Sequence, residues 1–544
     1  MFAGMTANEF WARVAEVPGL GRLGAAVRPR TQIKRLHAFV RRRLRPIEVP
    51  SEAGGAGHLL AALKAADAGD VYWSNEFFYR WLDSAGGPEA DGDGVMAVDR
   101  RFAVRTERRV DATTKEEVVH RLARDGRYPG AAVALARRIA RAGRLGDALD
   151  LAQRGLAAAR RRRAMSDIHV LENQIAALER AIAGKPVHRA LRRYLGDDDK
   201  YLEERTCPFP FERMDIQENG NAGVCCAQWM PGFSIGNVMQ GRSAAQLYNS
   251  EQAVSVRRSV LDGSFRHCDL VKCPWIAGDR LPRKAEVEGR NARRAVETGR
   301  LRFERPSYVV LAFDASCNLS CPSCRVRVIT EKAKVQVEKE ALIESTIMPL
   351  LRDVERLNID PAGEVFVSRP LRRLLSKLNR RDFPRLAIEI ISNGTLFTPR
   401  EWAKFPGIHD MVESVRISTD GATKATFEKL RRGARWEPFL DNMRFLASLR
   451  QSGAIKLLQF SLTYQLDNFR EMPAFVDLCR SLDPMAQVIF EKLENWGTFK
   501  PEEYARKAVH IATHPRHEEF LSIIRMPELK PSPPLLTADY AGLI

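Results

Sequence analysis

Three cysteines stand close together within residues 308–325, whose sequence is YVVLAFDASCNLSCPSCR. They are Cys317, Cys321 and Cys324. Three thiolates at this spacing can bind three irons of a [4Fe-4S] cluster, which usually takes four cysteines, so one iron would stay open. With a distant fourth ligand, the same thiolates could instead surround a zinc ion. The spacing alone is compatible with both kinds of metal site.

A second group of cysteines lies earlier in the chain. Its members are Cys207, Cys225, Cys226, Cys268 and Cys273. The dipeptide Asn219-Gly220 predicts a tight turn between two short strands, which would present the adjacent cysteine pair at the end of a hairpin. Four of these thiols could close around one iron-sulfur cluster or one zinc ion.

The clustering of the cysteines indicates metal binding rather than disulfides. Eight of the nine cysteines lie between positions 207 and 324, whereas a secreted disulfide framework belongs to a short, cysteine-dense chain. The ninth, Cys479, lies in the amphipathic segment NFREMPAFVDLCRSL, and we expect it to be a buried helical thiol.

Repeated strands separated by helix-length segments must position these groups. Apolar runs end near Phe313, Asp360, Ser392, Ser418, Thr463 and Lys492. This spacing predicts an α/β fold in which right-handed crossovers curl six βα units into a partial TIM-like barrel. The first cysteine group follows the first of these strands, at the strand end where such barrels carry their active sites.

The sequence predicts five segments. Residues 1–200 are expected to be helical, and GRYPGAAVALARRIARAGRLGDALDLAQRGLAAA is similar to one tetratricopeptide unit, with another helix over about 166–183. Residues 86–94 are expected to form a flexible loop. The cysteine-rich module spans 201–281, a helical linker spans 282–305, the barrel spans 306–500, and an extension with an extended tail from Pro527 spans 501–544.

Composition favours a soluble globular protein of 544 residues, 45% hydrophobic and 28% charged. No window holds 18 uncharged apolar residues, and the N-terminus has no secretory pattern, so we expect a cytoplasmic protein without a membrane partner. The net charge of +18 could mark a nucleic-acid partner. Arginine runs are more commonly solvated helix faces, so we expect no specific nucleic-acid binding.

The segment around Cys317, Cys321 and Cys324, with the strand before it, resembles the radical S-adenosylmethionine superfamily. The resemblance implies that the open iron of a catalytic [4Fe-4S] cluster chelates the amino and carboxylate groups of S-adenosylmethionine. It also implies that the reduced cluster cleaves this cofactor to a radical that abstracts a substrate hydrogen. An electron donor such as flavodoxin or ferredoxin would then be a partner.

The second cysteine group resembles the SPASM module, which binds auxiliary [4Fe-4S] clusters in peptide-maturing radical enzymes. The shared features are the order of cysteine, Asn-Gly turn, Cys-Cys pair, Gly236-Asn237, a helix with Arg257 and a closing cysteine pair. Here the module precedes the barrel, whereas it follows it in most relatives. The resemblance implies one auxiliary cluster, with ligands Cys207, Cys268, Cys273 and one of Cys225 and Cys226, of which Cys225 is slightly preferred.

The resemblance also assigns residues that would bind the cofactor. Gly363 and Glu364 match the latter part of the Gly-Gly-Glu motif that meets the amino group, although Pro361 and Ala362 stand where glycine is usual. Asn393 and Ser418 are candidates for the ribose hydroxyls, and Arg431 for the carboxylate, which suits a guanidinium fork.

Several further polar residues follow predicted strands. Ser323 stands where the family usually has an aromatic residue against adenine. Tyr464, Gln465 and Asn468 follow the fifth strand and could face cofactor or substrate, and Trp496 after the sixth could form a substrate wall.

Three classes of function remain at this point. The first is a radical S-adenosylmethionine oxidoreductase that modifies a peptide, a protein or another metabolite. The second is an RNA-modifying enzyme using the same chemistry, suggested only by the charge. The third is a non-catalytic scaffold stabilised by zinc.

Overall fold

The computed structural model describes residues 129–544, apart from 163–164, 197–199, 231, 361 and 543–544. The predicted helices before residue 129 and the predicted loop at 86–94 lie outside the described residues. The chain divides into two compact units. The first comprises Met1–Pro186 with Tyr194–Gly196, and the second comprises Val187–Arg193 with Asp197–Ile544.

The described part of the first unit consists mainly of three helices. They are α7 (Pro129–Arg141), α8 (Leu145–Arg162) and α9 (Met165–Ile182), which confirms the helices predicted for this stretch. Small residues let the helices approach closely: a Cβ on Gly155 would lie 2.7 Å from the Cβ of Ala132. The turn between α7 and α8 contains Gly143 with a φ of 79°, a conformation that glycine adopts without steric cost.

The second unit is built on one ten-stranded, mostly parallel sheet, with the order β10-β9-β8-β7-β6-β5-β4-β1-β2-β3. The strands are β1 (Arg213–Gln217), β2 (Asn221–Gly223), β3 (Gly236–Asn237), β4 (Tyr308–Ala312), β5 (Arg356–Ile359), β6 (Ala387–Ser392), β7 (Val412–Ser418), β8 (Leu457–Tyr464), β9 (Gln487–Lys492) and β10 (Leu536–Ala538). The six strands predicted from the apolar runs, β4 to β9, are confirmed.

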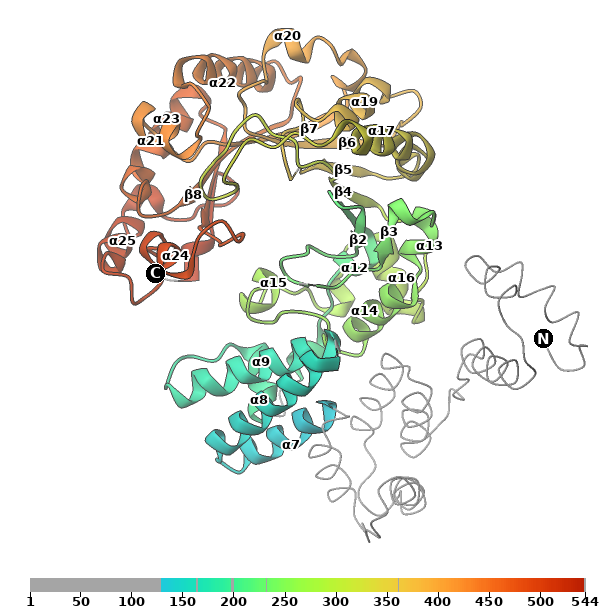
Figure 1. Ribbon diagram of the computed structural model, residues 1–544, viewed down its shortest axis with the longest axis vertical. Helices are drawn as coiled ribbons and strands as arrows, with labels where there is room; N and C mark the ends of the chain where they lie inside the picture. The colour runs from blue at the N-terminus through green and yellow to red at the C-terminus, as the bar shows by residue number, and fades with distance from the viewer. Residues whose placement is uncertain (1–128, 163–164, 197–199, 231, 361, 543–544) are drawn as a thin grey trace, which may run out of the picture. The chain divides into compact units, whose positions relative to one another are not determined.

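Strands β4 to β9 are parallel and lie side by side in chain order. Right-handed crossovers between such strands place all connecting helices on one face of the sheet, and Figure 1 shows them along its outer side. These helices are α17 (Ala333–Leu342), α18 (Met348–Leu351), α19 (Arg369–Lys377), α20 (Pro399–Trp402), α21 (Lys424–Leu430), α22 (Trp436–Gln451) and α23 (Met472–Leu482). The carboxyl ends of the six strands therefore share one edge.

The two faces of this sheet differ in chemistry. The face toward the helices is apolar and buried, with residues such as Leu311, Ile390 and Ile417. The opposite face carries hydrogen-bonded polar side chains on most strands. On it, Asn358 Nδ2 donates to Glu389 Oε2 over 2.9 Å, and Gln459 Nε2 donates to Gln487 Oε1 over 2.8 Å. Other polar members include Arg213, Asp215, Tyr308, Arg416 and Glu491.

The cysteine-rich segment forms part of this sheet. Strand β1 pairs in parallel with β4, with Arg213 opposite Tyr308, and then turns back as the antiparallel β2. The predicted hairpin is thus confirmed, with Gly220 at a φ of 80° in its turn. The helices before and after it are α10 (Arg189–Arg192), α11 (Tyr201–Glu204), α12 (Phe209–Glu212), α13 (Ala244–Tyr248), α14 (Glu251–Leu261), α15 (Pro274–Ala277) and α16 (Arg290–Thr298). Helix α16 lies within residues 282–305, the segment expected to form a helical linker.

The C-terminal residues add to the opposite edge of the sheet. Helices α24 (Pro501–Lys507) and α25 (His517–Ile524) precede β10, which pairs in parallel with β9. The tail was expected to be extended, and its strand pairing was not predicted. Tyr464 at the end of β8 donates a hydrogen bond to Asp539 over 2.6 Å, which fixes the tail against the sheet.

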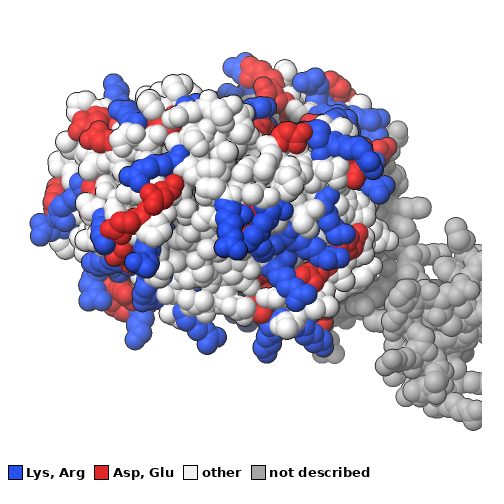
Figure 2. Space-filling view, turned by 90° about the horizontal axis from the view of Figure 1, so that it is seen from above, with Lys and Arg blue, Asp and Glu red and all other residues white. Residues whose placement is uncertain are grey.

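Within the described ranges, no helix is long and apolar enough to cross a membrane. Figure 2 shows basic and acidic side chains interspersed over one face of the molecule, with a group of basic ones in one area. Several arginines have acidic partners: Arg369 and Arg373 of α19 form ion pairs with Glu340 and Glu344.

Candidate metal and cofactor site

The first cysteine group lies in the loop that follows β4. Cys317 and Cys321 are buried, whereas Cys324 is exposed. Two backbone contacts shape the loop: Cys317 N–H donates to the carbonyl of Ile329 over 2.8 Å, and Cys324 N–H donates to the carbonyl of Cys321 over 2.9 Å. The loop thus stands at the shared carboxyl edge of the parallel strands, as the sequence predicted.

Each of the three thiols has an N–H donor from a different segment. Asn393 Nδ2 lies 3.8 Å from Cys317 Sγ, and Arg431 Nη1 lies 3.8 Å from Cys321 Sγ. Arg325 Nη2 lies 3.3 Å from Cys324 Sγ. Hydrogen bonds to sulfur stabilise thiolates and tune the metal centres that they hold.

Burial and charge act in opposite directions on the buried thiols. Burial raises the pKa of Cys317 and of Cys321, while the positive charges of Arg325 and Arg431, respectively, lower it. The thiols also affect one another, since a charge on Cys321 raises the pKa of Cys317 and a charge on Cys324 raises that of Cys321. The three sulfurs therefore form one electrostatic group.

Gly363 and Glu364 lie directly against the start of the cysteine loop. A Cβ on Gly363 would lie 2.1 Å from the carbonyl oxygen of Ser316, so only glycine fits. Glu364 N–H donates to the same carbonyl over 2.8 Å. The Glu364 carboxylate is fully buried and accepts from Ser392 Oγ over 2.8 Å and from Asn393 N–H over 2.7 Å. This carboxylate ties the loop after β5 to the end of β6.

Asn393 belongs to the same network, whereas Ser418 does not. Asn393 Nδ2 donates to Asn318 Oδ1 over 3.0 Å, which joins the loop after β6 to the cysteine loop. Ser418, the last residue of β7, is half-buried and lies opposite Ser461 of β8. Asn393 and Ser418 both occupy the predicted strand edge. Of these two residues, only Asn393 contacts a cysteine among the described contacts.

Arg431 is held by Asp420, and this ion pair is almost buried. Arg431 Nη2 lies 2.9 Å from Asp420 Oδ2. Burial lowers the pKa of Arg431, but the charges of Asp420 and Cys321 outweigh it and raise the pKa. Arg431 Nε is a buried donor that has no partner among the described residues. A buried donor without a partner costs free energy, so this atom is suited to an anionic ligand beside Cys321.

Four thiols of the second cysteine group also act on one another. Burial raises the pKa of Cys207 to about 12, and the charge of Cys273 adds to the shift. Burial likewise raises the pKa of Cys225 well above its usual value, and the charges of Cys207 and Cys268 raise it further. The group of Cys207, Cys225, Cys268 and Cys273 matches the ligand set implied by the resemblance.

Cys226 lies outside this group. Burial raises its pKa, but the neighbouring charges are Arg213, Asp215 and Asp360 rather than other thiols. The side chain of Cys226 lies 3.9 Å from Gln228 Oε1. None of the nine cysteines, all of which lie in the described part of the chain, forms a disulfide, and Cys479 is buried in α23, as predicted.

The two cysteine groups lie toward opposite ends of β4. Cys225 follows β2, whose last residue, Gly223, lies opposite Asp215 in the middle of β1, and Cys225 lies close enough to Arg213, the first residue of β1, for their charges to interact. The start of β1 is in turn beside the start of β4. The first cysteine group follows the carboxyl end of β4, a strand of five residues that spans about 13 Å.

The other polar residues predicted at the strand edge differ in how exposed they are. Gln465 and Asn468 are buried, and Asn468 Nδ2 donates to the carbonyl of Asp420 over 3.0 Å, so it supports the loop that carries Asp420. Trp496 is 60% exposed. Its neighbour Thr498 donates to the carbonyl of Ser323 over 3.3 Å, which brings the loop after β9 against the cysteine loop.

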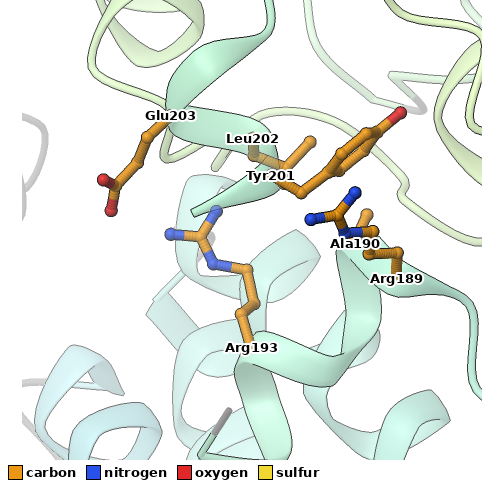
Figure 3. Close-up of a pocket in the computed structure, with 6 residues that line it drawn as sticks. All are labelled: Arg189, Ala190, Arg193, Tyr201, Leu202 and Glu203. Carbon is orange, nitrogen blue, oxygen red and sulfur yellow. The ribbon is translucent and has the colours of Figure 1, made fainter. Parts of the chain in front are cut away.

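A small pocket lies elsewhere in the second unit (Figure 3). Its lining residues are Arg189, Ala190, Arg193, Tyr201, Leu202 and Glu203. The Arg189 guanidinium lies 4.9 Å from the centre of the Tyr201 ring. The lining includes none of the predicted site residues.

Sequence reasoning missed Arg325, which contacts Cys324 and bridges two loops. The available signal was an arginine directly after the third cysteine. In the part of the chain that the structure describes, no set of three or more His, Cys, Asp or Glu side chains is arranged to hold a single metal ion. The ligands of a cluster bind different irons and therefore lie farther apart than those of one ion.

Comparison with known proteins adds no identification. No family model matches the chain, and no curated protein matches it significantly.

Proposed function

We propose that the protein is a radical S-adenosylmethionine oxidoreductase. Its catalytic [4Fe-4S] cluster would be held by Cys317, Cys321 and Cys324, and an auxiliary cluster by the second cysteine group. The observation that carries the proposal is the trio of thiols at the shared strand edge, each with its own N–H donor. A ligand set of three leaves one iron for the cofactor.

The residues around the thiols fit these groups. Thiolates are the usual ligands of iron-sulfur clusters, and nearby arginines offset their negative charge. Arg431 adds a buried Nε donor that has no partner within the described part of the chain, and this donor would bind the carboxylate of S-adenosylmethionine. Gly363, Glu364 and Asn393 would position the cofactor through the loops that they tie together. When bound, the cluster and the cofactor supply the hydrogen abstraction, while the chain holds the reactants and excludes water.

The finer architecture belongs to the same proposal. Sequential parallel strands with helices on one face are the arrangement of a partial (βα)6 barrel, and the hairpin with its four thiols would correspond to a SPASM-like module. A substrate on the polar sheet face would meet amide and hydroxyl groups as well as paired charges. We propose a peptide, a protein or another metabolite as the substrate class and a small redox protein as the electron donor.

Metal content tests the proposal directly. Protein purified and reconstituted without oxygen should hold about eight irons per chain, four at each group. A variant with Cys317, Cys321 and Cys324 all replaced by alanine should retain about half. Four irons in the wild type, with one zinc left in the triple variant, would instead identify the second group as a structural zinc site.

Two further variants separate the roles of the thiols. Cys225→Ala should lose the iron of the second group, whereas Cys226→Ala, the matched control, should keep it. The reduced wild-type protein should convert S-adenosylmethionine to 5′-deoxyadenosine, and Cys321→Ala should not. Full cleavage by the Cys321→Ala protein would refute the catalytic assignment.

A further inference from the structure

Arg325 is an almost buried cation beside the first cysteine group. Arg325 is only 8% exposed to solvent. Nη1 donates to the carbonyl of Ala315 over 2.8 Å, and Nη2 donates to the carbonyl of Ala362 and to Cys324 Sγ, 3.3 Å away. The guanidinium thus joins three segments: the residues directly after β4, the cysteine loop and the loop that carries Gly363.

The charge of Arg325 has an unusual set of neighbours. Among the described residues, no carboxylate lies within ion-pair distance of its guanidinium, whereas Arg431 on the other side of the group is paired with Asp420. The acidic group that its guanidinium does contact is the thiol of Cys324, whose Sγ lies 3.3 Å from Nη2. A buried cation without a counter-charge is unfavourable, so the site favours an anionic group at the first cysteine group.

We propose that Arg325 is the positioning and charge-balancing residue of the metal centre held by Cys317, Cys321 and Cys324. This inference rests on the proposed function. A cluster held by three thiolates is anionic, and each added electron makes it more so. A fixed guanidinium that also donates to a ligand sulfur therefore stabilises the reduced state and raises the reduction potential. Its planar fork, which lysine lacks, holds the two carbonyls and the sulfur together.

Redox titration of reconstituted full-length protein tests the charge. The signal to follow is the one that Cys317→Ser removes, which separates it from that of the second cysteine group. In Arg325→Gln, we expect the midpoint potential to fall by about 59 mV, a tenfold change in the one-electron equilibrium. Arg325→Lys keeps the charge and should retain most of the wild-type potential.

Iron release to a chelator tests the positioning. Both Arg325→Lys and Arg325→Gln should lose iron about ten times faster than the wild type, because neither can hold both carbonyls and the sulfur. Arg432→Gln is the matched control. Arg432 binds the same loop through Ser320 Oγ over 3.0 Å, but it is exposed. Because its charge is in contact with water, its replacement should change neither the midpoint potential nor the rate of iron release.

The outcomes separate this inference from the proposed function. A wild-type protein that takes up no iron at Cys317, Cys321 and Cys324 overturns both. A wild-type cluster whose potential and release rate are unchanged in Arg325→Gln overturns only the role of Arg325. Equal potential shifts in Arg325→Gln and Arg432→Gln would also overturn it, because they would reflect general surface charge.

Discussion

Replacing Gly363 by alanine would disturb the contact between the loop after β5 and the start of the cysteine loop. The added Cβ would lie 2.1 Å from the carbonyl oxygen of Ser316, where about 3.0 Å is the closest approach that real Cβ atoms make. The two backbone segments must therefore separate by about 0.9 Å. Neither atom belongs to a flexible side chain, so the strain cannot be relieved by a rotamer change.

The cost of this substitution can be estimated from two contributions. Overpacking against a fixed neighbour costs about 1 to 3 kcal/mol. The Ser316 carbonyl also accepts the N–H of Glu364, and loss of that bond costs about 1 kcal/mol more. We expect a total of about 2 to 4 kcal/mol, which would lower the thermal midpoint of the second unit by about 3 to 5 °C. Because Ser316 precedes Cys317, the variant should also lose iron from the first cysteine group.

Gly407→Ala is the matched control for this experiment. Its added Cβ would lie 2.4 Å from the carbonyl oxygen of Leu378, so it also meets a backbone atom, but away from all the cysteines. Thermal midpoints and iron content should be measured for both variants. Gly407→Ala should lower the midpoint and keep the iron, whereas Gly363→Ala should lower both. An unchanged midpoint and iron content in Gly363→Ala would show that the two loops do not meet as described.

Three other predictions concern the cofactor, pH and the C-terminal tail. In the first, Arg431→Ala is combined with Asp420→Asn so that no buried carboxylate is left unpaired. This double variant should bind S-adenosylmethionine ten- to a hundredfold more weakly in anaerobic calorimetry. Unchanged affinity would show that Arg431 does not bind the cofactor. Burial raises the pKa of Cys207 to about 12 in the folded, metal-free protein. As the pH rises, the unfolded chain therefore loses this proton before the folded chain does, which favours unfolding. The free energy of unfolding should fall between about pH 8.5 and pH 12. The thermal midpoint should therefore fall less steeply with pH in Cys207→Ser, and equal slopes would contradict this. Tyr464→Phe removes the bond to Asp539 and should cost about 1 kcal/mol, seen as faster proteolysis of the tail; an unchanged cleavage rate would show that the bond does not hold it.

Strands β4 to β9 could be predicted because each reads as a short apolar run. The pairing of β1 with β4 and of β10 with β9 could not be predicted, because the partner strands lie far apart in the sequence and local patterns do not specify which strands pair. Tyr464 illustrates the same limit. Its place at a strand end suggested a role at the site, but the tail supplies Asp539 as its partner.

Within the site, the types of residue could be predicted from the sequence, but which atoms their side chains contact could not. Cys225 and Cys226 are adjacent, and only the fold decides which thiol joins Cys207 and Cys268. Arg325 is visible as the neighbour of Cys324, but the direction of its guanidinium depends on two carbonyls, one from Ala315 before the cysteines and one from Ala362 in the loop after β5. Such convergence arises from tertiary structure, which local patterns do not encode.

The position of β1 beside β4 has a consequence for how the chain folds. About ninety residues, 218–307, must be looped out before these strands can pair, and the entropy of closing a loop grows with the logarithm of its length. A metal centre bridging Cys207 and Cys273 would reduce the open loop to about forty residues and lower this cost by about 0.7 kcal/mol. Without metal, β4 would remain longer as an unpaired sheet edge, a template for aggregation. Metal supply during synthesis would then govern how much of the chain reaches its folded state.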